Sequence, residues 1–208
     1  SNGVDLSKYE PVLQKDAELA AQYGLEGKFV AGYIGTHGMA HGLEHIVAVA
    51  EQLQSELDFR IVFAGGGATR EKVVDLVKEK KLNNVVFIER QPKEMMPRVW
   101  SLCDVSLVPL KNSDLFKTVI PSKIFECMGM GLPVLMSAPE GEATGIVSKT
   151  NSGYLVGPES PNKLVCEILN IKNNPMEYKS KVKSCLGSAS DYSRVNQAVK
   201  MLGFLSGQ

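Results

Sequence analysis

From about Lys28 onward, short runs of β-branched and apolar residues alternate with longer segments in which apolar residues recur every three or four positions. This alternation predicts an α/β fold, a Rossmann-like parallel sheet of six strands with helices on both faces. The expected strands are Phe29–Gly35, Phe59–Gly65, Val85–Ile88, Val105–Pro109, Pro133–Ser137 and Gly153–Val156. The expected helices are Leu43–Glu56, Arg70–Lys80, Lys93–Leu102, Pro121–Met130, Glu142–Ser148 and Asn162–Asn170.

The flanking segments divide the chain further. The first expected helix has an apolar face that should pack on the sheet, made of Leu43, Ile46, Val47, Ala50, Leu53 and Leu57. Residues 28–172 form the predicted Rossmann-like domain, and residues 173–208 a C-terminal helical extension. In the leading segment 1–27, a turn is expected at residues 2–5, and Pro11 delays any helix until about Val12.

Composition excludes some classes of partner. The 208 residues are 44% hydrophobic, enough for one good core, and Lys plus Arg equal Asp plus Glu at 23 each. The charge balance therefore gives no case for nucleic acid or for an anionic membrane surface. Four widely spaced cysteines in apolar stretches predict reduced core thiols and a cytoplasmic location; they are Cys103, Cys127, Cys166 and Cys185. The sequence contains no export signal and no apolar run of membrane-spanning length.

Two loops that leave expected strands are rich in glycine. In an open parallel sheet, ligands bind outside the carboxyl ends of the strands. The first loop covers residues 35–42, Gly-Thr-His-Gly-Met-Ala-His-Gly, and opens a helix whose free amides could hold an anion. The second is Gly65-Gly66-Gly67. A plain structural turn remains open for each, because neither matches a dinucleotide or P-loop fingerprint.

All three histidines of the chain lie in or after the first of these loops. His37, His41 and His45 are spaced by four, as ligands on one helix face would be. Gly38 and Gly42 place His37 in the loop instead, so we predict no metal site. A phosphate contact by His41 is favoured, with solvated loop histidines as the alternative.

A third candidate segment runs from Leu110 to Ile120 and leads into Pro121-Ser122-Lys123. Proline suits the start of a helix, and Ser122 and Lys123 reinforce the positive end of the helix dipole, where a phosphate could rest. Glu126 lies one turn further on the same face, and a carboxylate can accept hydrogen bonds from two vicinal hydroxyls, such as those of a ribose. The alternative is an ordinary surface glutamate.

Taken in order along the chain, these stretches resemble the carboxyl-terminal domain of the group 1, or family 4, retaining glycosyltransferases of the GT-B fold. The resemblance covers nearly the whole sequence. It is carried by residues 2–5, 32–44, 63–67, 103–109, 121–134 and 153–156.

The resemblance implies one half of a two-domain enzyme. The first 27 residues would hold an interdomain linker, and a preceding acceptor-binding domain would lie outside this sequence. The donor would be a nucleoside diphosphate sugar, most simply a uridine one, with no further cofactor. The implied catalytic residues are His41 and Lys123. The implied substrate-binding residues are Gly35, Thr36, His37, Gly38, Gly66, Arg90, Ser122 and Glu126.

Two departures from the family pattern are visible. Thr118 stands where the first glutamate of the family's pair is expected, and His41 stands where many members have lysine. These departures resemble a subgroup that transfers N-acetylated amino sugars, such as N-acetylfucosamine, to lipid-linked precursors of surface polysaccharides. That implies a sugar or lipid-linked acceptor and peripheral association of the whole protein with the inner face of the membrane. Two other classes stay open, a noncatalytic nucleotide-sugar-binding or interaction module and an epimerase or nicotinamide-dependent enzyme.

Overall fold

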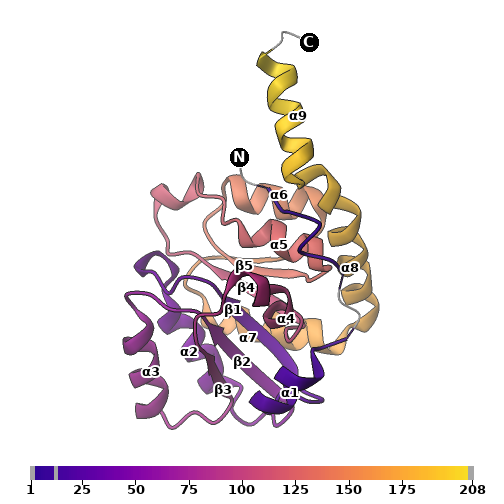
Figure 1. Ribbon diagram of the computed structural model, residues 1–208. Helices are drawn as coiled ribbons and strands as arrows, with labels where there is room; N and C mark the ends of the chain where they lie inside the picture. The colour runs from indigo at the N-terminus through magenta and orange to yellow at the C-terminus, as the bar shows by residue number, and fades with distance from the viewer. Residues whose placement is uncertain (1–2, 12–13, 206–208) are drawn as a thin grey trace.

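The centre of the molecule is a parallel sheet of six strands in the order β3-β2-β1-β4-β5-β6 (Figure 1). A computed structural model describes the backbone of residues 3–11 and 14–205 and the side chains as far as residue 199. The strands are β1 (Phe29–Ile34), β2 (Phe59–Ala64), β3 (Val85–Ile88), β4 (Val105–Pro109), β5 (Val134–Ser137) and β6 (Gly153–Val156). All six predicted strands are confirmed, to within one residue at each end. The predicted α/β Rossmann-like fold is therefore the observed one.

Helices cover both faces of the sheet. One apolar layer joins the sheet to α2 (Leu43–Gln52), α3 (Arg70–Glu79) and α7 (Pro161–Asn173). The layer on the other face involves α1 (Ala17–Tyr23), α4 (Met96–Trp100), α5 (Lys123–Met130) and α6 (Glu142–Thr150). After α7 the chain continues into α8 (Pro175–Ala189) and α9 (Arg194–Leu205), and α9 extends away from the body (Figure 1). No described helix is long and apolar enough to cross a bilayer.

The predicted helices differ in extent from those observed, and three of the differences affect the packing or the site. The first predicted helix ends at Gln52, so Leu57 lies beyond it with 81% of its surface exposed, and its predicted place on the apolar face is wrong. The segment predicted as one helix from Lys93 is a 3-10 turn followed by the short helix α4. The helix predicted from Pro121 begins at Lys123, with Ser122 as its N-cap. Proline therefore precedes this helix instead of occupying its first turn.

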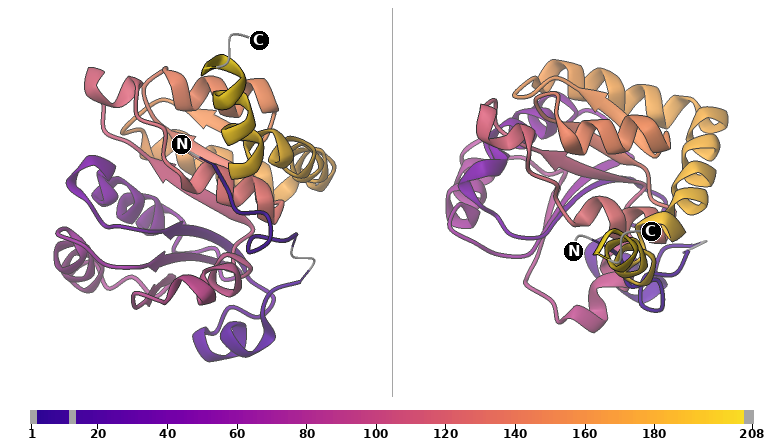
Figure 2. Two further views of the ribbon diagram at one scale, coloured as in Figure 1. Left: turned by 45° about the horizontal axis from the view of Figure 1, so that its top comes forward. Right: turned by 90° about the horizontal axis from the view of Figure 1, so that it is seen from above.

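The N-terminal segment pairs with the start of α9. Val4 forms a parallel β-bridge with Ser193, and its N–H donates to the carbonyl of Tyr192 at 3.0 Å. The predicted turn at residues 2–5 is therefore wrong in the described part, because Val4 is extended and the turn lies at residues 6–9. Asn2 and Val12 lie outside the described residues. Figure 2 shows this segment running beside the base of α9.

The cysteines fit the expected core placement with one exception. Cys103, Cys127 and Cys185 are free and buried, and burial raises the pKa of the Cys103 and Cys185 thiols to about 12. Cys166, on α7, is exposed, so the prediction of a core position for it is wrong. Its apolar sequence neighbours face the sheet while its own side chain faces outward.

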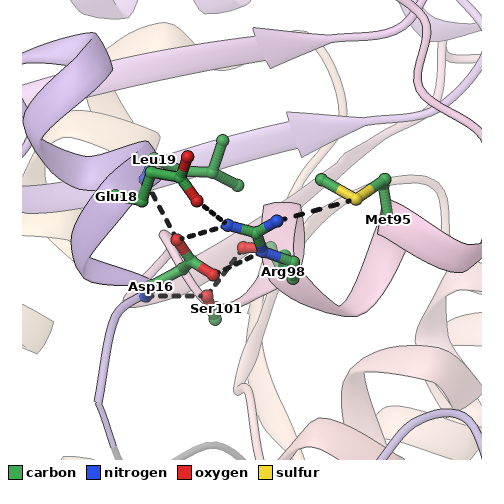
Figure 3. Close-up of polar contacts among 6 residues, drawn as sticks. All are labelled: Asp16, Glu18, Leu19, Met95, Arg98 and Ser101. Atoms are coloured by element: carbon green, nitrogen blue, oxygen red, sulfur yellow. Dashed lines mark hydrogen bonds and ion pairs between the residues drawn. The ribbon is translucent and has the colours of Figure 1, made fainter.

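A polar clamp fixes α1 to α4. The guanidinium of Arg98 donates to Asp16 at 2.6 Å and to Glu18 at 2.7 Å, and Asp16 also caps α1 by accepting from the amide of Leu19 at 3.0 Å (Figure 3). The hydroxyl of Ser101 accepts from the amide of Asp16 at 3.1 Å. The clamp holds α4 in place from the side opposite to α5.

We expect Asp16→Ala to lower the free energy of unfolding at pH 7 by about 1–2 kcal/mol, because it removes an N-cap. Asp16→Asn should cost less, since an asparagine oxygen still caps the helix. Hydrogen bonds from Arg98 lower the pKa of Asp16, so the stabilisation is present above the unfolded value and is lost as pH falls through the folded value. Urea unfolding at pH 7 and below about pH 4 measures it. An Asp16→Asn deficit that persists in acid would contradict this account.

Candidate functional site

The carboxyl ends of the central strands open onto two adjoining cavities. Strands β1 to β3 follow one another toward one edge of the sheet, and strands β4 to β6 toward the other edge. In open α/β sheets, ligands bind at the point where this order reverses, here between β1 and β4. The first cavity, of about 690 Å³, lies between the loop after β1 and the start of α5. The second, of about 430 Å³, lies at the ends of β2 and β3. The two share five lining residues, Ile34, Gly35, Thr36, Lys93 and Met96.

The glycines of the two strand-exit loops have different roles. A Cβ on Gly65 would lie 2.2 Å from the carbonyl oxygen of Gly35, and one on Gly67 would lie 2.7 Å from that of His37. Both residues have positive φ, so they let one loop pack against the other through backbone contact. A Cβ on Gly66 would meet nothing within 4 Å, and Gly66 lines the second cavity. All three glycines line the second cavity, but only the middle one has room for a side chain.

Several amides of the first loop are occupied within the fold. The N–H of Gly35 donates to Ala64 at 2.9 Å and that of His37 to Gly66 at 2.9 Å. The N–H of Gly38 donates to Thr36 at 3.0 Å. These bonds correct the expectation that the glycine loop offers a run of free amides. Positive charge at the first cavity must come largely from another source.

Within the described part of the chain, four lysine and arginine residues line the first cavity, and Lys123 is the one that lies against the first loop; the others are Lys8, Lys93 and Arg194. The Nζ of Lys123 lies 3.4 Å from the position that a Cβ on Gly35 would occupy, and 4.0 Å from the centre of the Tyr33 ring. The Nζ atom is buried and has no hydrogen-bond partner among the described residues. Burial lowers the pKa of Lys123 to about 8. The fold thus holds an ammonium group in a site where an anion would be its natural partner.

Glu126 lines the first cavity from the next turn of α5. Its Oε2 accepts a hydrogen bond from the indole Nε1–H of Trp100 at 3.2 Å. Burial raises the pKa of Glu126, while the bond from Trp100 and the charge of Lys123 oppose that effect. The partly buried carboxylate therefore differs from the ordinary surface glutamate that was the alternative.

The three histidine rings have separate environments, and the ring of His45 lies near the Glu159 carboxylate, with 3.5 Å between Nε2 and Oε1. His41 lines the first cavity, and its Nδ1 lies 3.0 Å from the carbonyl oxygen of Pro109, so Nδ1 carries the proton. Burial lowers the pKa of His41, and neutral imidazole then presents Nε2 as an acceptor. The His37 ring is 0% exposed and packs against Tyr33 and Phe63. Burial lowers its pKa to about 4.

The structure brings most of the predicted site residues together. Gly35 and Thr36 line both cavities. The first cavity also contains His41, Ser122, Lys123 and Glu126, and the second contains Gly66 and Arg90. His37 and Gly38 line neither cavity, and the His37 ring is buried in the aromatic core instead.

Comparison with known proteins decides the family. The profile of the family described as "Glycosyl transferases group 1" matches residues 15–184, most of the chain. The chain belongs to the group 1 glycosyltransferases. Among solved structures, HepE from Anabaena, crystallised with UDP and glucose, superposes with a TM-score of 0.82 at 18% identity, covering 99% of this chain and 55% of that one. The C-terminal domain of LpcC from Francisella tularensis, a group 1 glycosyl transferase, superposes with a TM-score of 0.76 at 17% identity, covering 92% of this chain and 100% of that one.

Two curated members of the family are similar in sequence. The putative colanic acid biosynthesis glycosyl transferase WcaI of Escherichia coli is 28% identical over 172 residues, which are 80% of this chain and 42% of WcaI. The alpha-D-kanosaminyltransferase of Streptomyces kanamyceticus is 24% identical over 161 residues, 76% of this chain and 40% of that protein. This chain thus spans less than half the length of these group 1 glycosyltransferases.

Thr118, where the group 1 glycosyltransferase pattern suggested a glutamate, is exposed at the end of the 3-10 turn Asp114–Lys117. Its hydroxyl donates to the carbonyl of Leu115 at 3.5 Å. Phe116 and Val119 line the first cavity, but Thr118 does not. Asp114 pairs with Lys117 at 2.7 Å on the surface, so it does not converge with Glu126.

Sequence patterns did not identify several residues that shape the site. Tyr9 and Arg194 line the first cavity although they come from opposite ends of the sequence, which no local pattern could bring together. Tyr33 and Trp100 were hidden because each looks like an ordinary core aromatic. A signal was available for Trp100, since it is the single tryptophan of the chain and its N–H needs a partner when buried.

Proposed function

We propose that this chain is the donor-binding domain of a retaining glycosyltransferase that uses a nucleoside diphosphate sugar, with uridine as the base. The observation that carries the proposal is the buried ammonium group of Lys123 beside Gly35, which has no hydrogen-bond partner among the described residues and shares a cavity with the Glu126 carboxylate. One group suits a diphosphate and the other a pair of sugar hydroxyls. The HepE structures with UDP and with UDP-glucose support this choice of ligand.

The two cavities suggest how such a ligand would lie. The diphosphate would rest in the first cavity against Lys123, Thr36 and the start of α5, whose positive end includes Ser122. The ribose hydroxyls would bind Glu126. The base would enter the second cavity, between Gly66 and Arg90. His37 and Gly38 would support the loop from below without touching the ligand.

In the proposed reaction the bond between the anomeric carbon and the leaving diphosphate breaks, the acceptor oxygen bonds to that carbon with retention, and the hydroxyl proton passes to the departing diphosphate. Negative charge develops on the diphosphate as it leaves, and Lys123 is placed to stabilise it. Neutral His41 would accept a hydrogen bond from a sugar hydroxyl at Nε2. The nucleotide sugar is a substrate, and the proposal needs no metal or further cofactor.

The finer assignments form part of the same proposal. The acceptor, a sugar or lipid-linked hydroxyl, would be held by a preceding domain, and the donor would carry an N-acetylated amino sugar. The names of two relatives, a colanic acid biosynthesis enzyme and a kanosaminyltransferase, are compatible with such chemistry. The proposed location is the cytoplasm, at the inner face of the membrane when the whole protein is assembled.

The proposal predicts that Glu126→Ala weakens UDP binding about tenfold or more, because hydrogen bonds to a charged group are each worth about 1.5–3 kcal/mol. Isothermal titration of this chain with UDP measures the loss. In the protein with its acceptor domain, the same change should reduce sugar transfer by at least that factor. Lack of UDP binding to the unaltered chain, or transfer undiminished by Glu126→Ala, would overturn the proposal.

A second candidate is a noncatalytic nucleotide-sugar-binding or interaction module. The exposed position of Thr118, outside the cavity lining, favours it, because the family pattern suggested a carboxylate there. This candidate predicts UDP binding by the chain but no transfer by the protein with its acceptor domain. The chain alone should not transfer sugar under either candidate.

A further inference from the structure

The contact between Trp100 and Glu126 joins two helices across the site. Trp100 is the last residue of α4, and only 1% of its surface is exposed. Its Nε1–H donates to Oε2 of Glu126 on α5 at 3.2 Å. An indole N–H is a donor only, so this bond favours the ionised form of Glu126, and it leaves Oε1 unoccupied.

The orientation of that carboxylate matters for its proposed partner. Two vicinal hydroxyls can each donate one hydrogen bond to one carboxylate, provided that its plane faces them. A glutamate side chain rotates freely about three bonds unless something restrains it. Trp100 is well placed to restrain it, because the indole is held in the core while Glu126 lines the cavity.

We propose that Trp100 is a positioning residue, which aims the Glu126 carboxylate at the vicinal hydroxyls of the bound nucleotide. The inference rests on the proposed function and adds a residue that lines neither cavity. Trp100 does not touch the ligand. It acts through one hydrogen bond to the group that does.

Contacts on two sides hold α4 in a fixed position, which suits this role. Met96 and Val99 of the same short helix line the second cavity, where the base is proposed to bind. The clamp from Arg98 to Asp16 and Glu18 fixes the outer side of the helix (Figure 3). One rigid element would therefore set both the base pocket and the direction of the ribose-binding carboxylate.

The test compares UDP with 2′,3′-dideoxy-UDP, which lacks the two hydroxyls. The unaltered chain should bind UDP at least tenfold more tightly than the dideoxy compound, and Glu126→Gln should remove most of that preference. Trp100→Phe should reduce the preference about three- to tenfold while changing the affinity for dideoxy-UDP little. Leu102→Val, a buried core change outside both cavity linings, should leave the ratio unaltered.

A second measurement does not depend on any replacement of Trp100. Because the chain has one tryptophan, a single indole N–H signal appears in its ¹⁵N NMR spectrum. That signal should shift with the titration of Glu126, whose other charged or titratable neighbours are Lys123, Arg194, Tyr9 and Cys127. The shift should be absent in Glu126→Gln. UDP should displace the signal further than dideoxy-UDP does.

The outcomes separate this inference from the proposed function. UDP binding with the same hydroxyl preference in Trp100→Phe as in the unaltered chain would overturn the role of Trp100 alone. An equal loss of affinity for both nucleotides in Trp100→Phe would also overturn the role of Trp100. The same holds for an indole N–H signal that does not shift when Glu126 titrates. Failure of the unaltered chain to bind UDP at all would overturn the proposed function and this inference with it.

Discussion

Replacing Lys123 with methionine should weaken the binding of UDP by about 10- to 100-fold and leave the binding of uridine nearly unchanged. Methionine keeps an unbranched apolar side chain over Tyr33 but removes the ammonium group that lies beside Gly35. Charge-assisted hydrogen bonds to phosphate are worth about 1.5–3 kcal/mol, which gives the expected range. Isothermal titration with both ligands measures the difference.

The affinity for UDP should also depend on pH through this residue. Since the pKa of Lys123 is about 8 in the free protein, its charge is present at pH 7 and is lost as pH rises through that value. A bound diphosphate favours the charged form, so UDP affinity should fall between pH 7 and 9.5 in the unaltered chain and stay flat in Lys123→Met. Lys149→Met, an exposed change on α6, is the matched control. Equal losses of UDP and uridine binding would show that the ammonium group does not meet the diphosphate.

Replacing Gly65 with alanine should destabilise the protein by about 3 kcal/mol, lowering the Tm by about 10 °C. Two costs combine at this position. A Cβ would lie 2.2 Å from the carbonyl oxygen of Gly35, which is backbone and has no room to yield, and φ is +121°, a conformation that alanine rarely adopts. Thermal unfolding followed by circular dichroism measures the change.

The adjacent glycine provides the control. Gly66→Ala places its Cβ in open space, so its free energy of unfolding should change by no more than about 0.5 kcal/mol. Because Gly66 lines the second cavity, its alanine variant should affect ligand binding more than stability. If both variants unfolded at the same temperature, the close contact between the two strand-exit loops would not exist in solution.

Most of the fold could be predicted because its signals are local. Each strand is a short apolar run bounded by turn residues, which is the pattern of a strand in a parallel sheet buried on both faces. The last residues of helices could be predicted less accurately than the strands. The apolar pattern that includes Leu57 continues past the helix, and nothing in the sequence marks Gln52 as its last residue.

The site could be predicted in position but only partly in detail. Gly35 and Lys123 were expected at the same edge of the sheet because each lies on a segment that leaves a predicted strand. The observed strand order places the exits of β1 and β4 side by side. Which amides remain free depends on bonds between loops, such as that from His37 to Gly66, and the sequence does not reveal them. The same limit hid the pairing of Val4 with Ser193, which joins residues almost a whole chain apart.

The burial of Lys123 lowers the free energy of unfolding at neutral pH, and natural selection must have tolerated this loss. An unfolded lysine holds its proton up to a pKa of about 10.4, whereas this one gives it up near 8, so protonation at neutral pH favours the unfolded chain. Directed evolution toward heat tolerance, run without a ligand, should therefore discard this residue early. Retention of this lysine would distinguish sequences selected for ligand binding from sequences selected only for thermal stability.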